Sequence, residues 1–253
     1  MNAELEQYEI MIAAERQRFA DRMTPFHNET RPTVADLFLI HFCSRGVGMT
    51  EPVEDWIRRA GENTCKIGYE ELGSGLIRHA EHEAGHHELM IADTRSLVTR
   101  WNASHDTKLD PEAFLSQPLS RNVVRYRELH EEYIRGESPY CQIAIEYEIE
   151  RISVTYGALF FARIIQLVGS DVLGCLSFIH EHVALDVGHT NYNMRLMERF
   201  LEKVPAALEP LVAAGARALD IYASHLEDCM QFAELMDGQH RMSEVANVAQ
   251  SLT

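Results

Sequence analysis

The chain has 253 residues, of which 46% are apolar and 25% are charged, and its formal net charge is −16. This length and composition are those of a globular protein that can bury a full core. So large an acidic surplus repels phosphate groups, which argues against nucleic acids and anionic membranes as partners. Carboxylates that bind cations also count toward the −16, so part of the surplus can be internal.

The five cysteines are widely scattered and include no CxxC pair. This pattern predicts a reduced, cytoplasmic protein in which cysteines serve as small apolar residues. The charged N-terminal segment lacks the apolar run of a signal peptide. No window approaches 18 uncharged apolar residues, so we also expect no membrane span.

Helical periodicity runs through the sequence, and alternating strand patterns are hard to find. Asp110 is placed to cap a short helix, Ser138 followed by Pro139 to begin a long one, and Gly136 and Gly169 to end helices. In chain order the predicted helices span residues 3–22, 33–62 (capped at Thr33, and continuous or restarted at Pro52), 69–101, 110–115, 120–135, 138–168, 170–204 and 206–236.

No linker, low-complexity segment or tandem repeat divides the chain. We therefore predict a single all-α domain over residues 1–253, a bundle of seven or eight helices with a frayed tail after Gly238. Bundles of this kind place metal and cofactor sites in their core, between facing helices.

The decapeptide HEHVALDVGH, residues 180–189, concentrates metal-binding side chains on one predicted helix. His182, Asp186 and His189 follow the spacing i, i+4, i+7, which places them within roughly 60° of arc on one helix face. The alternative interpretation is a solvated face that happens to be rich in histidine. We interpret Gly188 as room for a neighbouring helix or a ligand.

A second predicted helix repeats this pattern in the stretch RHAEHEAGHHELM. Glu83 and His86 form the Glu-x-x-His pairing that di-iron bundles use. His79, Glu83 and His86 repeat the four-then-three spacing, and Gly85, like Gly188, precedes the last histidine. His87 is the alternative to His86, and His79 is a further candidate. The repetition on two helices favours a metal site over a solvated face.

Carboxylates on two further helices complete the candidate site. Glu146 and Glu150 share a face of an otherwise apolar segment, where a carboxylate is unfavourable unless it is paired or binds a metal. At least one of them should therefore be a ligand. Glu51 is the candidate on the fourth helix, with an ordinary helix-dipole role as the alternative. Histidines with carboxylates and no cysteine suit Fe or Mn better than Zn, Mg or Ca.

With these motifs the sequence resembles the haem-oxygenase-like di-iron oxidases and oxygenases. The hallmark of that family, His-x-x-x-Asp-x-x-His on a late helix, is matched by His182, Asp186 and His189. Glu150 fits the family's preceding carboxylate by spacing. The resemblance implies the following ligands: Glu51, Glu83, His86, Glu150, His182, Asp186 and His189. His79, His87 and Glu146 are the alternatives.

The resemblance also implies an activity. Members of this family bind two ferrous ions, activate O2 and oxidise a small organic substrate held in the bundle. Their reactions include N-oxygenation of amines and oxidative C–C cleavage or decarboxylation of amino or fatty acids. We therefore expect an oxidoreductase with two Fe ions, or an Fe/Mn pair, and O2 as co-substrate. An external electron donor and assembly as a homodimer are further expectations.

Two other functions are compatible with the same fold. A thiaminase-like or quinone-forming enzyme would work without metal and would use a polar pocket or a cysteine nucleophile, for which Cys141 and Cys175 are the candidates. A non-enzymatic iron-binding protein would use the same ligands without oxidising a substrate.

Overall fold

The structure is a computed structural model that describes residues 2–251, with side chains as far as Met242. The described residues form helices joined by short turns, and no strand occurs among them. The helices are α1 (Ala3–Arg22), α2 (Thr24–Asn28), α3 (Pro32–Thr50), α4 (Val53–Lys66), α5 (Glu70–Ala80), α6 (His86–Ser104), α7 (Pro111–Leu115), α8 (Arg121–Arg135), η1 (Pro139–Cys141), α9 (Gln142–Val168), η2 (Ser170–Cys175), α10 (Ser177–Lys203), η3 (Pro205–Ala207) and α11 (Leu208–Ser251).

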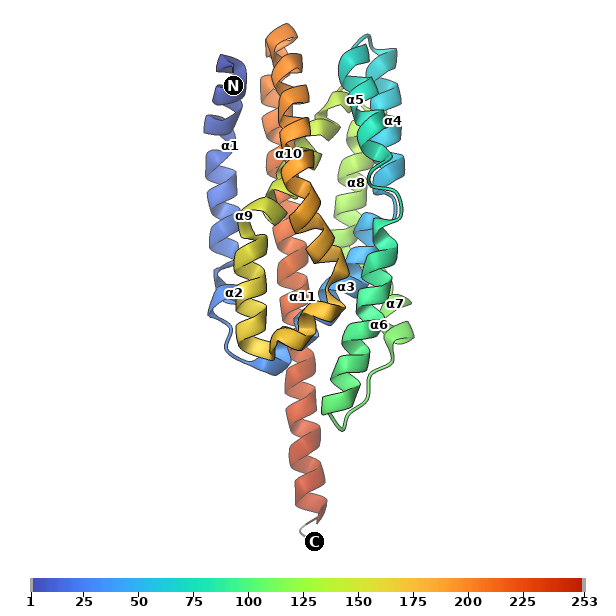
Figure 1. The fold of residues 1–253 in the computed structure, drawn as a ribbon, viewed down its shortest axis with the longest axis vertical. Helices are drawn as coiled ribbons and strands as arrows, with labels where there is room; N and C mark the ends of the chain where they lie inside the picture. The colour runs from blue at the N-terminus through green and yellow to red at the C-terminus, as the bar shows by residue number, and fades with distance from the viewer. Residues whose placement is uncertain (1, 252–253) are drawn as a thin grey trace.

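The long helices lie along the long axis of an elongated bundle, with α11 running lengthwise through it (Figure 1). Helix α11 packs against α1, α3, α8 and α9, whereas α4 pairs with α5, α3 with α6, and α9 with α10. The α9–α10 contact is close at Gly157, where a Cβ would overlap the side chain of Val183. This approach brings together the two helices that carry most of the predicted carboxylates and histidines.

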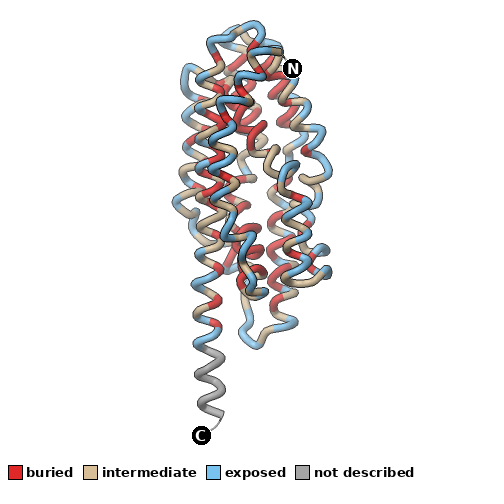
Figure 2. The backbone as a smooth tube through the Cα atoms, turned by 90° about the vertical axis from the view of Figure 1, so that its left-hand side faces the viewer, coloured by how far each residue is buried: buried red, intermediate tan, exposed pale blue. Residues whose placement is uncertain are grey.

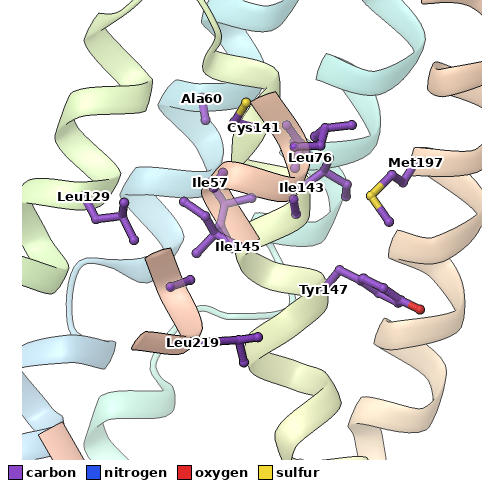
Figure 3. Packing of buried hydrophobic residues seen from close by; sticks show 14 of the residues in the cluster. Ile57, Ala60, Leu76, Leu129, Cys141, Ile143, Ile145, Tyr147, Met197 and Leu219 are labelled. Carbon is purple, nitrogen blue, oxygen red and sulfur yellow. The ribbon is translucent and has the colours of Figure 1, made fainter. Parts of the chain in front are cut away.

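Buried residues line the inner faces of the helices (Figure 2) and form two apolar clusters. In the first, Ile57, Leu76, Leu129 and Ile143 pack together from α4, α5, α8 and α9 (Figure 3). The second joins α3 and α6 to the end of α9 and the start of α10. Between the two clusters, the first part of α9 and the middle of α10 carry buried polar side chains. The candidate ligands thus occupy the junction of two separately packed halves.

Local sequence signals place most helix ends correctly. Helix α1 has the predicted bounds, and Asp110 caps α7 by accepting a hydrogen bond from the backbone N–H of Glu112. Helix α8 ends before Gly136, and α9 ends before Gly169, whose φ of +91° suits glycine. The predicted all-α bundle is therefore confirmed.

The prediction of one helix over residues 69–101 is wrong. Helix α5 ends at Ala80, and residues 81–85 form a turn before α6 begins at His86. Gly85 adopts φ +83° in this turn, a left-handed conformation that most side chains disfavour. Consequently His79, Glu83 and His86 do not share a helix face, and a folded turn brings them together instead.

Other boundaries differ from expectation by smaller amounts. Helix α3 begins at Pro32 rather than being capped by Thr33, and α4 restarts at Val53 after Pro52. A 3-10 turn, Pro139–Cys141, precedes α9, and Ser138 provides no side-chain cap. Helix α11 continues to Ser251, beyond the predicted end at residue 236 and through the segment expected to fray.

By length and composition, the segment Pro139–Val168 qualifies as a candidate membrane span among the described residues. Its most apolar window has a mean hydropathy of 1.3, and 11% of that window is buried. One such helix is weak evidence, and Arg151 and Arg163 lie within it. The sequence-based expectation of no membrane span stays a prediction.

Candidate metal centre

Five segments meet at the junction of the two apolar clusters. His79 lies at the end of α5, Glu83 in the following turn and His86 at the first residue of α6. Helix α9 contributes Glu150, and α10 contributes the remaining three candidates, His182, Asp186 and His189. Because α10 is continuous from Ser177 to Lys203, the helical spacing of its three candidates is preserved.

Glu83, His86 and His182 form one potential metal-binding group, with ligand atoms within 4.8 Å of one another. Glu83 Oε2 lies 2.9 Å from His86 Nδ1, and the His86 and His182 rings lie 4.7 Å apart between centroids. Nδ1 of His182 donates to the carbonyl of Phe178 at 2.8 Å. That hydrogen bond fixes the ring and leaves the lone pair of Nε2 available for a metal.

His79, Glu83 and Glu150 form a second group with the same spacing limit. His79 Nε2 lies 2.9 Å from Glu150 Oε1 and 3.9 Å from Glu83 Oε1. His189 Nδ1 is 3.5 Å from both Glu83 Oε1 and Asp186 Oδ1, and 3.8 Å from Glu150 Oε1. Glu83 therefore belongs to both groups, with Oε2 toward His86 and Oε1 toward His79 and His189. A carboxylate in this position could serve a metal ion held by either group.

Several polar atoms at this site are buried, and within the described residues they make no hydrogen bond of acceptable geometry even where an oppositely charged group is close: His79 Nε2 and Glu150 Oε1, which lie 2.9 Å apart, both carboxylate oxygens of Asp186, and His189 Nδ1. Leaving a buried polar group unsatisfied costs about 1–3 kcal/mol, and such groups in native proteins call for an explanation such as a bound ion. These atoms are the ligand types that iron and manganese accept. The donor set therefore fits the metal that the sequence predicted.

The electrostatics of the two carboxylates in these groups, Glu83 and Glu150, differ. Burial, reinforced by Asp186 and Glu83, raises the pKa of Glu150 well above its ordinary value. Burial also acts to raise the pKa of Glu83, but the hydrogen bond and charge of His86, with His79 and His182, outweigh it and lower that pKa to about 2. A cation beside Glu150 would stabilise the ionised form of this carboxylate and so lower its raised pKa.

Asn193 is a supporting residue that the sequence analysis missed. It is fully buried on α10, and its Nδ2 donates to Glu150 Oε2 at 2.8 Å. This bond fixes one oxygen of Glu150 and leaves the other facing His79. The signal was available in the sequence, because Asn193 continues the spacing of Asp186 and His189 by four more residues.

Some predicted ligands lie outside this cluster. The side chain of Glu51 is 59% exposed and pairs with Arg127 at 3.0 Å, so it serves as an ordinary surface partner. His87 Nε2 lies 3.3 Å from Glu88 Oε1 and takes no part in either group, whereas His86 does. Gly188 does not make room for a neighbouring helix, because a Cβ there would meet nothing within 4 Å in the described structure. Its suggested role in making room for a ligand stays a prediction.

Glu146 is buried beside the centre but is held by a different partner. Its Oε1 accepts a hydrogen bond from Gln142 at 2.5 Å, and it belongs to neither metal-binding group. Burial, together with the charges of Glu150 and Glu83, raises its pKa to about 8. Of the two carboxylates that the sequence left open, the geometry thus favours Glu150 as the ligand.

We expect Glu146→Gln to retain metal and to stabilise the metal-free protein increasingly as the pH rises. The folded pKa of about 8 exceeds the ordinary value of 4.5, so the folded wild type holds a proton that the unfolded chain has lost. The stability of the wild type therefore falls as the pH rises from 4.5 to about 8. The glutamine variant has no proton to lose at this position, so its stability does not fall for this reason. Urea unfolding across this range should show a difference that grows to a few kcal/mol near pH 8 and then stays level. Loss of iron in the Glu146→Gln variant would instead indicate that Glu146 is a metal ligand.

Two cavities adjoin the centre and share part of their lining. The smaller, of about 80 Å³, is lined by Glu83, Glu150, His182 and Asp186 together with neighbouring residues. The larger, of about 290 Å³, is mostly apolar and reaches His182 from the side of α2. Ligand sites are typically apolar pockets with a few polar groups, so the larger cavity could hold a small molecule beside His182.

Comparison with known proteins establishes the fold. A solved structure from Shewanella denitrificans, described as a domain of unknown function with a heme oxygenase-like fold, matches with a TM-score of 0.68. The match covers 94% of this chain and 95% of the other at 17% sequence identity. The chain therefore has a haem-oxygenase-like fold. No protein-family model matches it, and no curated protein matches it in sequence.

Proposed function

We propose that the protein is a non-haem di-iron oxidase or oxygenase that activates O2 and acts on a small organic substrate. The observation that carries the proposal is the position of Glu83 between two potential metal-binding groups. A carboxylate shared in this way suits two cations, and the surrounding histidines and carboxylates suit iron, with Fe/Mn as the mixed alternative. Two ferrous ions, when bound, supply electrons for the reduction of O2.

The chain's own residues would have distinct tasks in this function. His86 and His182 would hold one ion with Glu83, and His79, Glu150, Asp186 and His189 would hold the other. Asn193 would keep Glu150 oriented through its hydrogen bond. The carbonyl of Phe178 would do the same for His182. The apolar residues of the larger cavity would exclude water from the oxidised carbon or nitrogen atom of the substrate. Amine N-oxygenation and oxidative C–C cleavage or decarboxylation of an acid are the reactions proposed.

Metal analysis tests this proposal directly. After anaerobic reconstitution with Fe(II), we expect two iron ions per chain, and on mixing with O2 an optical change that reports oxidation of the iron. His182→Ala and Glu150→Ala should each lose iron, because each removes a ligand from a different group. Folded protein that stays free of iron after reconstitution would contradict the proposal. Full iron content in either variant would contradict its ligand assignment.

The structure disfavours a metal-free mechanism with a cysteine nucleophile. All five cysteines are free thiols, but burial raises the pKa of Cys141 to about 12 and also raises that of Cys175. A nucleophilic cysteine needs a lowered pKa. Neither residue lines the two described cavities beside the centre. A protein that only binds iron would not need the apolar cavity that His182 helps to line. This cavity therefore favours an enzyme over a non-enzymatic iron-binding protein.

A further inference from the structure

The smaller cavity beside the centre is too small for an organic substrate. Its volume is about 80 Å³, whereas sites for organic ligands usually hold about 300–1,000 Å³ and a benzene ring occupies a cavity of about 150 Å³. The space therefore suits a molecule of about two or three heavy atoms. Glu83, Glu150, His182 and Asp186 form part of its wall, so such a molecule would lie against the candidate ligands.

Much of the remaining wall of this cavity is apolar. It includes Phe42 and Met49 of α3, Met90 of α6 and Phe178 of α10. The two methionines are deeply buried, at 3% and 2% exposed. A buried water molecule needs two to four polar partners, which these side chains do not provide. They favour instead a small molecule that water holds weakly, such as O2.

His225 of α11 is a polar residue of the same wall that belongs to neither metal-binding group. It is 1% exposed, and its Nδ1 has no hydrogen-bond partner among residues 2–242. Two other polar residues of the wall are already engaged: Glu146 accepts a hydrogen bond from Gln142, and Thr50 donates to the carbonyl of Gly46. A buried ring nitrogen without a partner costs free energy, so its presence calls for an explanation.

The unpartnered nitrogen of His225 can act as a hydrogen-bond donor. Burial, followed by the charge of Arg45, lowers the pKa of His225 to about 4, so near neutral pH the ring is uncharged and carries a single N–H. Its Nε2 lies 3.7 Å from Cys229 Sγ, and burial raises the pKa of that thiol, which therefore keeps its proton. When the thiol donates to Nε2, the ring N–H lies at Nδ1 and is available to a molecule in the cavity.

We propose that the smaller cavity holds O2, the co-substrate of the proposed function, and that His225 orients it by donating a hydrogen bond from Nδ1. A small anion such as azide would take the same place. The identity of the ligand rests on the proposed function, whereas the cavity and His225 are features of the chain itself. The proposal adds to the centre a residue from α11, a helix that carries none of the predicted ligands.

Azide, an anion of three atoms, measures the contribution of His225. Titration of the iron-loaded, oxidised protein, followed by the optical band that azide gives with ferric iron, yields the dissociation constant. His225→Phe should weaken azide binding about tenfold or more, because it removes a hydrogen bond to a charged group. His225→Asn should recover most of the affinity, because its amide N–H can take the place of the ring N–H.

His41→Phe is the matched control. His41 of α3 is also buried, at 3% exposed, and its Nδ1 likewise has no partner within the described part of the chain. Its Nε2 lies 3.2 Å from a sulfur atom, Met236 Sδ, but the residue lines neither of the two cavities beside the centre. The control should leave the affinity for azide unchanged. Equal effects of the two phenylalanine variants, or no effect of His225→Phe, would overturn the role of His225.

The stability of the metal-free protein separates this role from a structural one. His225→Phe removes a buried nitrogen that lacks a partner, so the melting temperature should stay level or rise. A structural role predicts the opposite result. A melting temperature that falls further in His225→Phe than in His41→Phe would therefore contradict the proposal.

Dissolved O2 tests the cavity without metal. O2 is paramagnetic and relaxes nearby nuclei, so under O2 pressure the methyl signals of Met49 and Met90 should relax faster than that of Met197. Met197 is the control because it is buried to a similar degree and lines neither cavity beside the centre. Equal relaxation of the three methyl groups would overturn the assignment of the cavity to O2.

These measurements distinguish failure of this inference from failure of the proposed function. If O2 relaxes the two cavity methionines but the protein never binds iron, the cavity stands and the di-iron proposal fails. If two iron ions bind but O2 shows no preference for the cavity, only the inference about the cavity fails.

Discussion

Replacement of Glu83 with glutamine is expected to remove iron from both positions of the centre. Its two oxygens face different groups, one toward His86 at 2.9 Å and the other toward His189 at 3.5 Å. Glutamine keeps the shape but lacks the charge and one acceptor oxygen, so it cannot serve two cations. Since loss of a residue that only orients a ligand costs about 10–100-fold in metal affinity, we expect a loss of at least about 100-fold here.

Iron content after anaerobic reconstitution, and competition with a chelator, measure this effect. Glu81→Gln is the matched control, because Glu81 lies in the same turn but is exposed and belongs to neither group. It should bind iron as the wild type does. A Glu83→Gln variant that retains one tightly bound ion per chain would show that Glu83 serves a single position. Asn193→Ala should have a smaller effect, confined to the ion beside Glu150.

Gly85→Ala is expected to weaken both the fold and the metal centre. Gly85 adopts φ +83° in the turn between α5 and α6, where a Cβ costs about 1–2 kcal/mol. The turn carries Glu83 and positions His86, so a change in its backbone displaces two ligands of one group. Denaturant unfolding of the metal-free variant should show the loss of stability, and chelator competition should show weaker iron binding.

Gly188→Ala provides the contrasting control. Gly188 lies inside α10 with nothing within 4 Å of the Cβ position in the described structure. Alanine should therefore stabilise the protein by up to about 1 kcal/mol, because it favours the helix at a site without crowding. Iron binding should not change. If the two substitutions had the same effect, the turn would not need the left-handed backbone that we assign to Gly85.

Most of the helices, and the three candidate ligands on α10, could be predicted from the sequence. Helix propensity, caps at Asp110 and glycine stops at Gly136 and Gly169 act over a few residues, so they can be recognised without knowledge of the fold. The same holds for His182, Asp186 and His189, whose common face depends only on the continuity of α10. The proposal of iron or manganese likewise rests on the donor types.

The rest depended on contacts between helices. Glu51 has the sequence context of a ligand, but packing leaves it on the surface beside Arg127. His79 enters the centre because the chain turns at Gly85 instead of continuing as one helix. Glu146 and Glu150 are both buried on α9, and their contacts distinguish them: Gln142 holds Glu146, whereas His79 and Asn193 contact Glu150.

The sequence by itself determined the helical class, the principal ligand helix and the chemistry of the donors, because these depend on the spacing and type of neighbouring residues. Only the tertiary structure decided that Glu83 belongs to two groups and that an apolar cavity is lined in part by His182. Both features combine side chains from helices far apart in the chain. Their arrangement is set by how two apolar clusters pack around the polar residues between them, which no local pattern encodes.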